Sequence, residues 1–399
     1  MSVGVLVDLE RGAKAGGHVK CWERLAESAA RSPARIDLTV YFEGAEIRAE
    51  IVAPHVRLVE IPPAFGTRRV PFLSAIPDHT DLALLHPRLL RRLLRHDVLH
   101  TTDAFFAQAR TARLAARLGG AALVNSLHTD TPAYTRIYAA AIIRRLCGEG
   151  TLGRLLVERW RVPERVEARM ARQLARHVAR CHASLDRAAL RRGVDTHRFA
   201  PARRDRARLA REMGIGEDRL VLAFAGRLED GKGVMTLARA ARLLLDRGLP
   251  VHAVFAGEGR RRTEIASLLG VHASLPGAVE QERLAWLYAS ADLFVFPSAI
   301  EISPNVVLEA KASGLPVVVA PEGGGRFVRE SGVDGFVVED AREAAWADAV
   351  ARLSEAPARR AAIGRAARAE VERNHPSWDT VFAEDLLPAW RRAVEAQRR

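Results

Sequence analysis

Two series of short apolar runs, each followed by segments with helical spacing, constrain the fold of this chain most. The first series comprises Val3–Val7, Ile36–Phe42, Val56–Ile61, Asp97–His100 and Ala121–Ser126. The second comprises Leu220–Ala225, Val251–Ala256, Leu293–Pro297 and Val317–Ala320. Such alternation is typical of parallel sheets covered by helices. We therefore expect an α/β protein with two doubly wound, Rossmann-like domains that face each other across a cleft.

The boundary between the two domains is expected near residue 195. An Arg/Ala/Leu-rich helical stretch, Leu155–Arg192, precedes it, and glycine and proline punctuate the segment Gly193–Pro201 that follows. We therefore place the domains at 1–195 and 196–378. Residues 379–399 form a further helix with an apolar side suited to packing on either domain. Because doubly wound sheets bind ligands at the carboxyl ends of their strands, a ligand is expected in the cleft.

Composition narrows the class of protein. The 399 residues include 61 Lys+Arg and 48 Asp+Glu, which gives a formal net charge of +13. No apolar run reaches the roughly 18 residues that span a bilayer, and the N-terminus lacks the basic start of a signal peptide. We therefore expect a cytoplasmic protein. Its three cysteines, Cys21, Cys147 and Cys181, are too widely spaced for a zinc pair and odd in number, so free thiols are expected.

Arginines are scattered along helical segments such as Arg88–Arg95, where leucines recur on one face and arginines on the other. Two interpretations remain open for this segment: an amphipathic helix packed on a sheet, or a peripheral contact with an anionic membrane. No aromatic residues alternate with the arginines and no zinc-finger or RNA-binding motif occurs, so a nucleic-acid partner is disfavoured.

The segment between Phe296 and Pro316 carries the strongest local signals. Ser303 suits a helix N-cap, Pro304 suits the first helical position and Gly314 suits the position after the helix, so a helix is predicted from about 304 to 313. Its N-terminus would offer free backbone N–H groups to phosphate oxygens. Glu301 and Glu309 lie beside it, and carboxylates accept hydrogen bonds from hydroxyl groups. The combination predicts a sugar-nucleotide site.

A second signal is the glycine-rich turn 226–233, directly after a predicted strand. It holds Arg227 and Lys232, and two fixed cations neutralise a departing diphosphate as a metal ion does elsewhere. The chain contains no Asp-x-Asp metal motif, which agrees with metal-free chemistry. We therefore expect neither a metal nor a cofactor.

Two weaker signals lie in the N-terminal half. Gly16 and Gly17 sit in the first strand-to-helix loop, where backbone N–H groups could approach a phosphate, or where a flexible turn alone is needed. His128 follows a predicted strand and is expected to face the cleft, the alternative being a hydrogen-bonded core histidine.

Taken together, these motifs resemble the retaining, nucleotide-sugar-dependent glycosyltransferases of family 4 (group 1), which have the GT-B fold. The resemblance spans nearly the whole chain and rests on the following residues: the pair Glu301 and Glu309, the turn Gly226–Gly233, Gly193-Val194-Asp195 with Phe199 and Pro201, and Ala312–Pro316. One departure is Pro304, where many members have glycine or another small residue. Proline has no N–H, so one phosphate donor is missing.

The resemblance also implies roles. Domain 1–195 would bind the acceptor and domain 196–378 the donor, with Arg227 and Lys232 on the diphosphate. Glu309 would bind the ribose and Glu301 the hydroxyls of the transferred sugar. His128 would lie beside the anomeric carbon. The rest of the donor site would consist of Gly16, Gly17 and the backbone around Ser303, Asn305 and Val306.

The predicted activity is therefore metal-independent transfer of a hexosyl group, with retention, from a UDP- or GDP-sugar to a hydroxyl of a lipid, glycan or small metabolite. A sugar phosphorylase or a sugar-nucleotide epimerase of the same fold remains an alternative. So does a non-catalytic scaffold that binds a nucleotide sugar.

Overall fold

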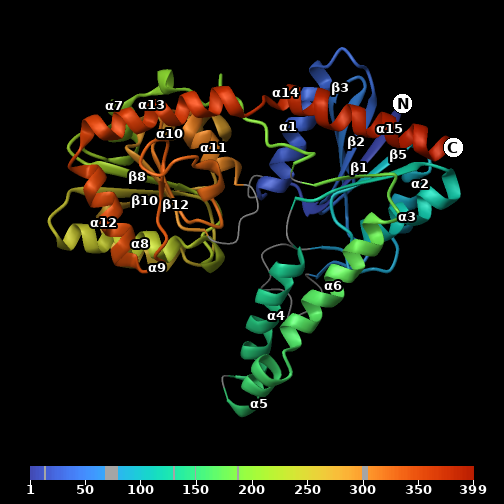
Figure 1. The fold of residues 1–399 in the computed structure, drawn as a ribbon, viewed down its shortest axis with the longest axis horizontal. Coiled ribbons are helices and arrows are strands. Elements are labelled where there is room, and N and C mark those ends of the chain that lie inside the picture. The colour runs from blue at the N-terminus through green and yellow to red at the C-terminus, as the bar shows by residue number, and fades with distance from the viewer. Residues whose placement is uncertain (13–14, 68–79, 129–130, 149, 187, 299–303) are drawn as a thin grey trace. The chain divides into compact units, whose positions relative to one another are not determined.

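The chain forms two compact units in a computed structural model (Figure 1). The first contains Met1–Arg191 together with Asp379–Arg399, and the second contains Arg192–Trp378. The structure describes residues 1–12, 15–67, 80–128, 131–148, 150–186, 188–298 and 304–399. Within these residues, no helix is both long enough and apolar enough to cross a membrane.

The first unit is built on a seven-stranded sheet in the order β3-β4-β2-β1-β5-β6-β7. Its strands are β1 (Ser2–Glu10), β2 (Asp37–Glu43), β3 (Arg48–Ala53), β4 (Val56–Ile61), β5 (Val98–Thr101), β6 (Ala122–Ser126) and β7 (Ala183–Leu185). Neighbouring strands are parallel except for β3, which pairs antiparallel with β4. Six of the seven residues of β2 are buried, as expected of a strand covered on both faces.

Helices cover this sheet. They include α1 (Gly17–Arg31), α2 (Pro87–Leu93) and α3 (Ala107–Gly119). On α1 the buried stripe runs through Val19, Trp22 and Leu25, which confirms the helical spacing predicted from the sequence. On α2, Leu89 and Leu93 are buried in the core. The leucine face of the basic segment 88–95 therefore packs on the protein, in agreement with the first of its two interpretations.

A helical hairpin follows β6 and projects from the sheet of the first unit. It consists of α4 (Thr131–Cys147), the short α5 (Thr151–Arg154), a wide helical turn at Leu155–Arg159 and α6 (Val162–Val178). The prediction of continuous helix over 155–192 is wrong at both ends. Arg161 adopts a left-handed conformation (φ 46°) that interrupts the helix before α6, and the chain enters β7 at Ala183. The Arg/Ala/Leu composition continues across both breaks, so composition did not reveal them.

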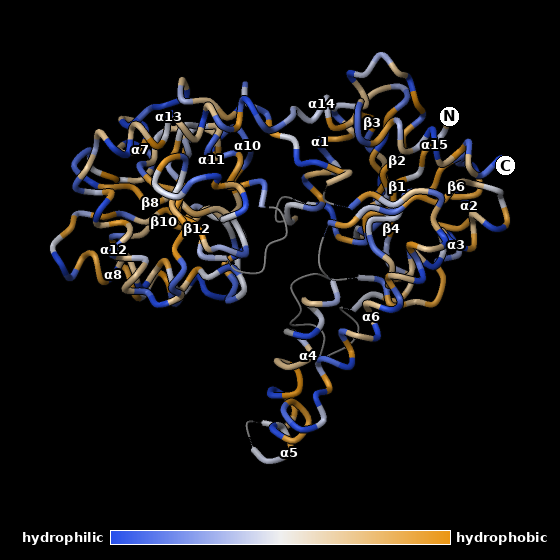
Figure 2. Tube along the Cα trace, in the orientation of Figure 1, coloured by the Kyte–Doolittle hydropathy of each residue, from blue (hydrophilic) through white to orange (hydrophobic). Residues whose placement is uncertain are grey.

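The second unit contains a six-stranded sheet in the order β10-β9-β8-β11-β12-β13, in which every pair of neighbours is parallel. The strands are β8 (Leu220–Ala225), β9 (Val251–Ala256), β10 (Ala273–Gly277), β11 (Leu293–Phe296), β12 (Val317–Val319) and β13 (Phe336–Val337). The helices are α7 (Arg206–Met213), α8 (Val234–Asp246), α9 (Arg262–Leu269), α10 (Gln281–Ser290), α11 (Asn305–Ala312), α12 (Glu343–Ser354) and α13 (Pro357–Asn374). All residues of β8, β9, β11 and β12 are buried, and Figure 2 shows hydrophobic residues gathered along the strands. The two doubly wound folds predicted from the sequence are confirmed.

The last segment returns to the first unit. It comprises α14 (Trp378–Thr380), a wide helical turn at Val381–Leu386 and α15 (Leu387–Arg398). Trp390 is fully buried, and its indole Nε1 donates a hydrogen bond of 2.9 Å to Nδ1 of His100 on β5. Asp385 accepts hydrogen bonds from the guanidinium of Arg191 at 2.7 and 3.1 Å. These contacts attach α15 to the sheet of the first unit.

Candidate functional site

The turn after β8 can form only because of its glycines. Gly226 has φ 145°, a conformation that residues with a side chain rarely adopt, and its N–H donates to the carbonyl of Ala256 at 3.0 Å. A Cβ at Gly257, just after β9, would overlap the carbonyl of Gly226. The loops that follow β8 and β9 are therefore packed together at the carboxyl edge of the sheet, where doubly wound folds bind ligands.

The same turn also lies against the end of β11. After a 3₁₀ turn at Asp230–Lys232, Gly233 takes a left-handed conformation (φ 65°) and begins α8. A Cβ on Gly233 would lie 2.8 Å from the Cβ and carbonyl oxygen of Pro297. Ser298 Oγ donates to the carbonyl of Gly231 at 3.2 Å. The Arg/Lys turn and the connection from β11 to α11, separate motifs in the sequence, are thus neighbours in the fold.

The two predicted cations of the turn are half-buried, and the acidic residues between them pair outside the turn. Glu229 accepts a hydrogen bond of 2.9 Å from Arg260, and Asp230 one of 2.6 Å from Arg261. Arg227 and Lys232 place two cationic side chains on this one turn, at the carboxyl edge of the sheet. Such a turn is suited to a polyanionic ligand.

Helix α11 starts one residue later than the sequence predicted. Pro304 is the cap residue, with an extended backbone (ψ 104°), and Asn305 is the first helical residue. Proline's fixed φ fits either position, so the sequence did not distinguish them. Gly314 takes the predicted left-handed conformation (φ 71°) after the helix. Ser303, the predicted cap, lies outside the described residues.

The site residues predicted on α11 are placed near one another in its first two turns. Asn305, Val306 and Glu309 are all half-buried. Burial, together with the negative charge of Glu309, raises the pKa of the buried Tyr288 phenol. The side-chain oxygen of Asn305 is buried and accepts no hydrogen bond from the described residues. Glu301, the other predicted carboxylate, lies outside those residues.

In the first unit, the structure brings Gly16 and Gly17 to the start of α1, close to His128. A Cβ at either glycine would meet nothing within 4 Å, so both border open space. His128 is buried, and its Nε2 is hydrogen-bonded to Ser126 Oγ at 2.8 Å. The ring of His18 stacks on that of His128 with centroids 4.3 Å apart and planes 12° apart.

His18 was not among the site residues predicted from the sequence. Its position directly after the two glycines placed it at a helix N-terminus, but nothing local indicated that it would contact His128. Trp22, one turn further along α1, approaches the same ring at 5.7 Å. The imidazole of His128 is thus held by a hydrogen bond at its edge and by aromatic contact on its face.

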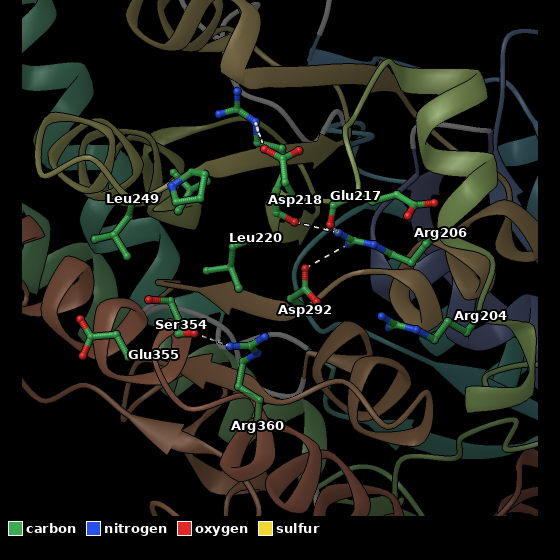
Figure 3. Close-up of a pocket in the computed structure, with 13 residues that line it drawn as sticks. Arg204, Arg206, Glu217, Asp218, Leu220, Leu249, Asp292, Ser354, Glu355 and Arg360 are labelled. Carbon is green, nitrogen blue, oxygen red and sulfur yellow. Dashed lines mark hydrogen bonds and ion pairs between the residues drawn. The ribbon is translucent and has the colours of Figure 1, made fainter.

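A pocket of about 540 Å³ lies elsewhere, at the amino ends of the strands in the second unit (Figure 3). Its lining includes Leu220 and Val251, the first residues of β8 and β9. Its arginines are bonded to the protein: Arg206 donates to Asp292 at 3.0 Å, and Arg360 donates to the carbonyl of Leu353 at 2.7 Å. The pocket contains none of the predicted site residues, and its guanidinium groups hold chain segments together.

Two parallel-sheet units, with glycine-rich turns and a helix N-terminus at the carboxyl edge of the second sheet, define a protein of the GT-B class. A family model described as "Glycosyl transferases group 1" matches residues 205–370. A D-inositol 3-phosphate glycosyltransferase from Catenulispora acidiphila is 30% identical over 370 residues, which cover 86% of this chain and 84% of that protein. The chain therefore belongs to the group 1 glycosyltransferases, a family of enzymes.

Other relatives match over a shorter length. A D-inositol 3-phosphate glycosyltransferase from Actinosynnema mirum is 37% identical over 223 residues, and the chain spans only about half of that relative, 52% of each protein being covered. Sucrose-phosphate synthase from Thermosynechococcus elongatus superimposes with a TM-score of 0.67 at 17% identity, covering 96% of both chains. HepE from Anabaena, solved in complex with UDP and glucose, gives 0.65 at 18% identity, covering 96% of this chain and 97% of its own. The two structures establish similarity of fold.

Proposed function

We propose that this protein is a retaining, metal-independent glycosyltransferase that moves a hexosyl group from a nucleotide-diphosphate sugar to an acceptor hydroxyl in the cytoplasm. The observation that carries the proposal is the junction between the Arg/Lys turn and the exit of β11, where Ser298 bonds Gly231. This junction places the turn that carries Arg227 and Lys232 beside the end of β11, at the carboxyl edge of the sheet of the second unit. That edge is where such sheets bind nucleotides.

In the second unit, Arg227 and Lys232 neutralise the diphosphate as it leaves, and the N–H groups at the start of α11 add to this stabilisation. Asn305 and Val306 contribute backbone groups to the same anion. Glu309 accepts hydrogen bonds from the ribose hydroxyls. Because Pro304 has no N–H, the anion is bound by one backbone donor fewer than the helix start would otherwise supply.

The remaining assignments follow from the family resemblance. Glu301 binds hydroxyls of the transferred sugar, and the backbone around Ser303 contributes to the donor site. Gly16 and Gly17 let backbone N–H groups approach the distal phosphate. His128 acts beside the anomeric carbon, and Ser126 fixes its orientation through the 2.8 Å hydrogen bond.

For the substrates, the relatives indicate where an assay should begin. HepE was crystallised with UDP and glucose, so UDP-glucose is the first donor to test, followed by GDP-sugars. Two relatives are named for D-inositol 3-phosphate, so a phosphorylated polyol is the first acceptor to test. A lipid or a glycan hydroxyl comes next.

Isothermal titration with UDP- and GDP-sugars in EDTA tests the donor site. Replacing Arg227 with Ala removes a charged hydrogen-bond donor, and replacing Glu309 with Gln exchanges a charged acceptor for a neutral amide that can also donate. We therefore expect donor affinity to fall about 10- to 100-fold. The matched controls are Glu355→Gln, just after α12, and Arg239→Ala, on α8, two exposed positions in the same unit, which should bind like wild type.

Two further readouts concern the chemistry. Anomeric proton NMR of the product should show the configuration of the donor sugar, and turnover should persist in EDTA. Inversion of the anomer would exclude the retaining mechanism. Unchanged donor affinity in both site variants would exclude the assigned donor site.

A further inference from the structure

The hairpin formed by α4 and α6 extends from the first unit and ends in a tip made of residues 144–148 and 150–165 (Figure 1). Its base is attached to the sheet by His177, which is buried and hydrogen-bonded to Thr101 Oγ1 and to the guanidinium of Arg113, both at 2.8 Å. Burial lowers the pKa of His177 to about 4, so this attachment is uncharged near neutral pH. The hairpin tip is therefore presented on a fixed base.

The hairpin tip exposes three large apolar side chains. Leu146 is 65% exposed, Leu152 is 55% exposed and Trp160 is 49% exposed. They come from the end of α4, from α5 and from the turn before α6, so the fold gathers them at one end of the hairpin. Figure 2 shows hydrophobic and hydrophilic residues side by side there. A soluble protein rarely exposes such a cluster unless it binds something.

The hairpin tip is also strongly basic. The hairpin, residues 131–178, has ten arginines, four glutamates and no lysine or aspartate, a net charge of +6 out of +13 for the chain. Within the described part of the chain, none of these arginines forms an ion pair: Arg144, Arg145, Arg154, Arg159 and Arg165. Arg161 has one distant partner, Glu164, at 3.9 Å. Among the residues that the structure describes, Glu164 is thus the one carboxylate paired with an arginine of the tip, and only at this distance.

A groove of about 340 Å³ lies at the hairpin tip. It is lined by Arg159, Trp160, Arg161, Glu164, Arg165 and Ala168. Arg161 is the one non-glycine residue with positive φ in the described chain, a conformation that costs free energy and often marks a binding segment. With three guanidinium groups, one carboxylate and an indole, the groove has an excess of positive charge and is suited to a phosphate beside an apolar side chain.

We propose that the hairpin tip docks on an anionic membrane, with lipid phosphates between Arg159, Arg161 and Arg165, and with Trp160 and the two leucines in the interfacial layer. A second copy of this chain is disfavoured as the partner, because two hairpin tips with the same positive charge repel one another. A nucleic acid is also disfavoured as the partner, because the exposed leucines would find no apolar surface on a phosphodiester backbone. In a membrane, the same aliphatic side chains insert between acyl chains. Tryptophan and arginine are the residues that favour the boundary between headgroups and acyl chains.

Vesicle co-sedimentation with the full chain tests this proposal and does not depend on glycosyl transfer. We expect binding to phosphatidylcholine vesicles containing 30% phosphatidylglycerol, and about tenfold weaker binding to phosphatidylcholine alone. Leu146→Ser with Trp160→Ala should lower binding to the anionic vesicles about tenfold. Leu118→Ser, at an equally exposed leucine (65%) on α3, is the matched control and should bind like wild type.

Charge is tested separately. Arg159→Glu with Arg161→Glu should abolish vesicle binding, whereas Arg391→Glu with Arg392→Glu, the same charge change on α15, should reduce it less than twofold. Unchanged circular dichroism and thermal midpoint establish that each variant is folded. Equal losses in both charge variants would overturn the proposal, because net charge alone would then explain binding. Wild-type binding to duplex DNA but not to vesicles, or dimerisation lost in the leucine–tryptophan variant, would also overturn it.

Discussion

Lys311 carries a buried charge on which the second unit depends. Its side chain is fully buried, and its ammonium donates 2.7 Å hydrogen bonds to Asp334 and Glu370 and a further one to the carbonyl of Phe327. Burial alone raises the pKa of Glu370, but hydrogen bonds from His375 and Lys311 and their charges lower it to about 2. Lys311 thus anchors α11, two residues after the proposed ribose ligand Glu309.

Lys311→Met should lower the free energy of unfolding at pH 7 by about 3–5 kcal/mol, because two buried carboxylates lose their cation. In wild type, the pKa of Glu370 in the folded protein lies below its usual 4.5. Its contribution to the free energy of unfolding is therefore complete above pH 4.5 and is lost as pH falls toward 2. In the variant, protonation of Asp334 and Glu370 at lower pH removes the free-energy cost of burying two carboxylates without a cation. The deficit measured by urea denaturation should therefore be smaller at pH 5 than at pH 7.

The control restores neutrality. Lys311→Met combined with Asp334→Asn and Glu370→Gln removes all three charges and should recover most of the lost stability. If the triple variant were as unstable as the single one, packing around the lysine stem would be the cause and the charge argument would be wrong.

Glu43 shows the opposite dependence on pH. It is buried at the end of β2 beside Asp8. Burial, with the charges of Asp81 and Asp103, raises its pKa to about 7, although a hydrogen bond with Asp8 acts in the opposite direction. Because the pKa of Glu43 in the folded protein lies above its usual 4.5, its protonation stabilises the folded protein. This contribution to the free energy of unfolding is complete below pH 4.5 and is lost as pH rises through 7. Glu43→Gln, which imitates the protonated acid, should reduce the loss of stability between pH 5 and pH 8 by about 1–3 kcal/mol.

Chemical denaturation at the two pH values measures this difference. Glu46→Gln, at an exposed glutamate in the same region, should reproduce the wild-type pH dependence. A Glu43→Gln protein that lost stability between pH 5 and pH 8 as wild type does would show that another group, such as the buried Asp8, whose pKa burial also raises, causes the loss.

Among the secondary-structure elements, the sequence predicted those whose signal is local. The strands β1, β2, β4, β5, β6, β8, β9, β11 and β12 were all expected within about three residues of their bounds. Strand β3 was missed because it is an exposed edge strand whose residues show no apolar run. Strand β7 was missed because it is three residues long and follows a helix of similar composition.

The same distinction applies to the candidate site. The turn with Arg227 and Lys232 was predictable, because glycines and a preceding strand determine it locally. The contact of His18 with His128 joins two loops that are distant in the sequence, so no local pattern contains it. Likewise, Lys311 lies on the helix predicted for 304–313. Its partner Glu370 lies on α13, and the sequence did not identify this ion pair.

The junction between two elements of the site is testable with a pair of glycines. Gly233 and Gly214 both have φ 65°, but a Cβ would lie 2.8 Å from Pro297 at the first and meet nothing within 4 Å at the second. Gly214→Ala should cost about 1–2 kcal/mol for the left-handed backbone alone. Gly233→Ala should cost more and also weaken donor binding, because the turn must move away from β11. Titration calorimetry and urea denaturation of both variants measure these effects, and equal costs with equal donor affinity would refute the junction.

At the scale of the whole molecule, the chain builds two units with separate cores. The core of the second unit runs from Val194 to Val371, whereas the first unit has its own core around Leu6, Tyr41 and Leu99. The sequence left open which unit the last helix joins. Its attachment rests on pairs distant in sequence, such as Arg31 with Asp379 at 2.6 Å, which no local pattern reveals.

Separate cores predict two calorimetric transitions that respond to different substitutions. Trp390→Phe leaves Nδ1 of the buried His100 without its donor, which should cost the first unit about 1–3 kcal/mol and lower one transition by roughly 2–12 °C. Lys311→Met should lower only the other transition, and a bound nucleotide sugar should raise that one because its proposed ligands are mostly in the second unit. Differential scanning calorimetry of the full chain separates these outcomes. If both transitions moved together in either variant, the two units would unfold as one cooperative structure, and α15 would couple them instead of completing the first unit alone.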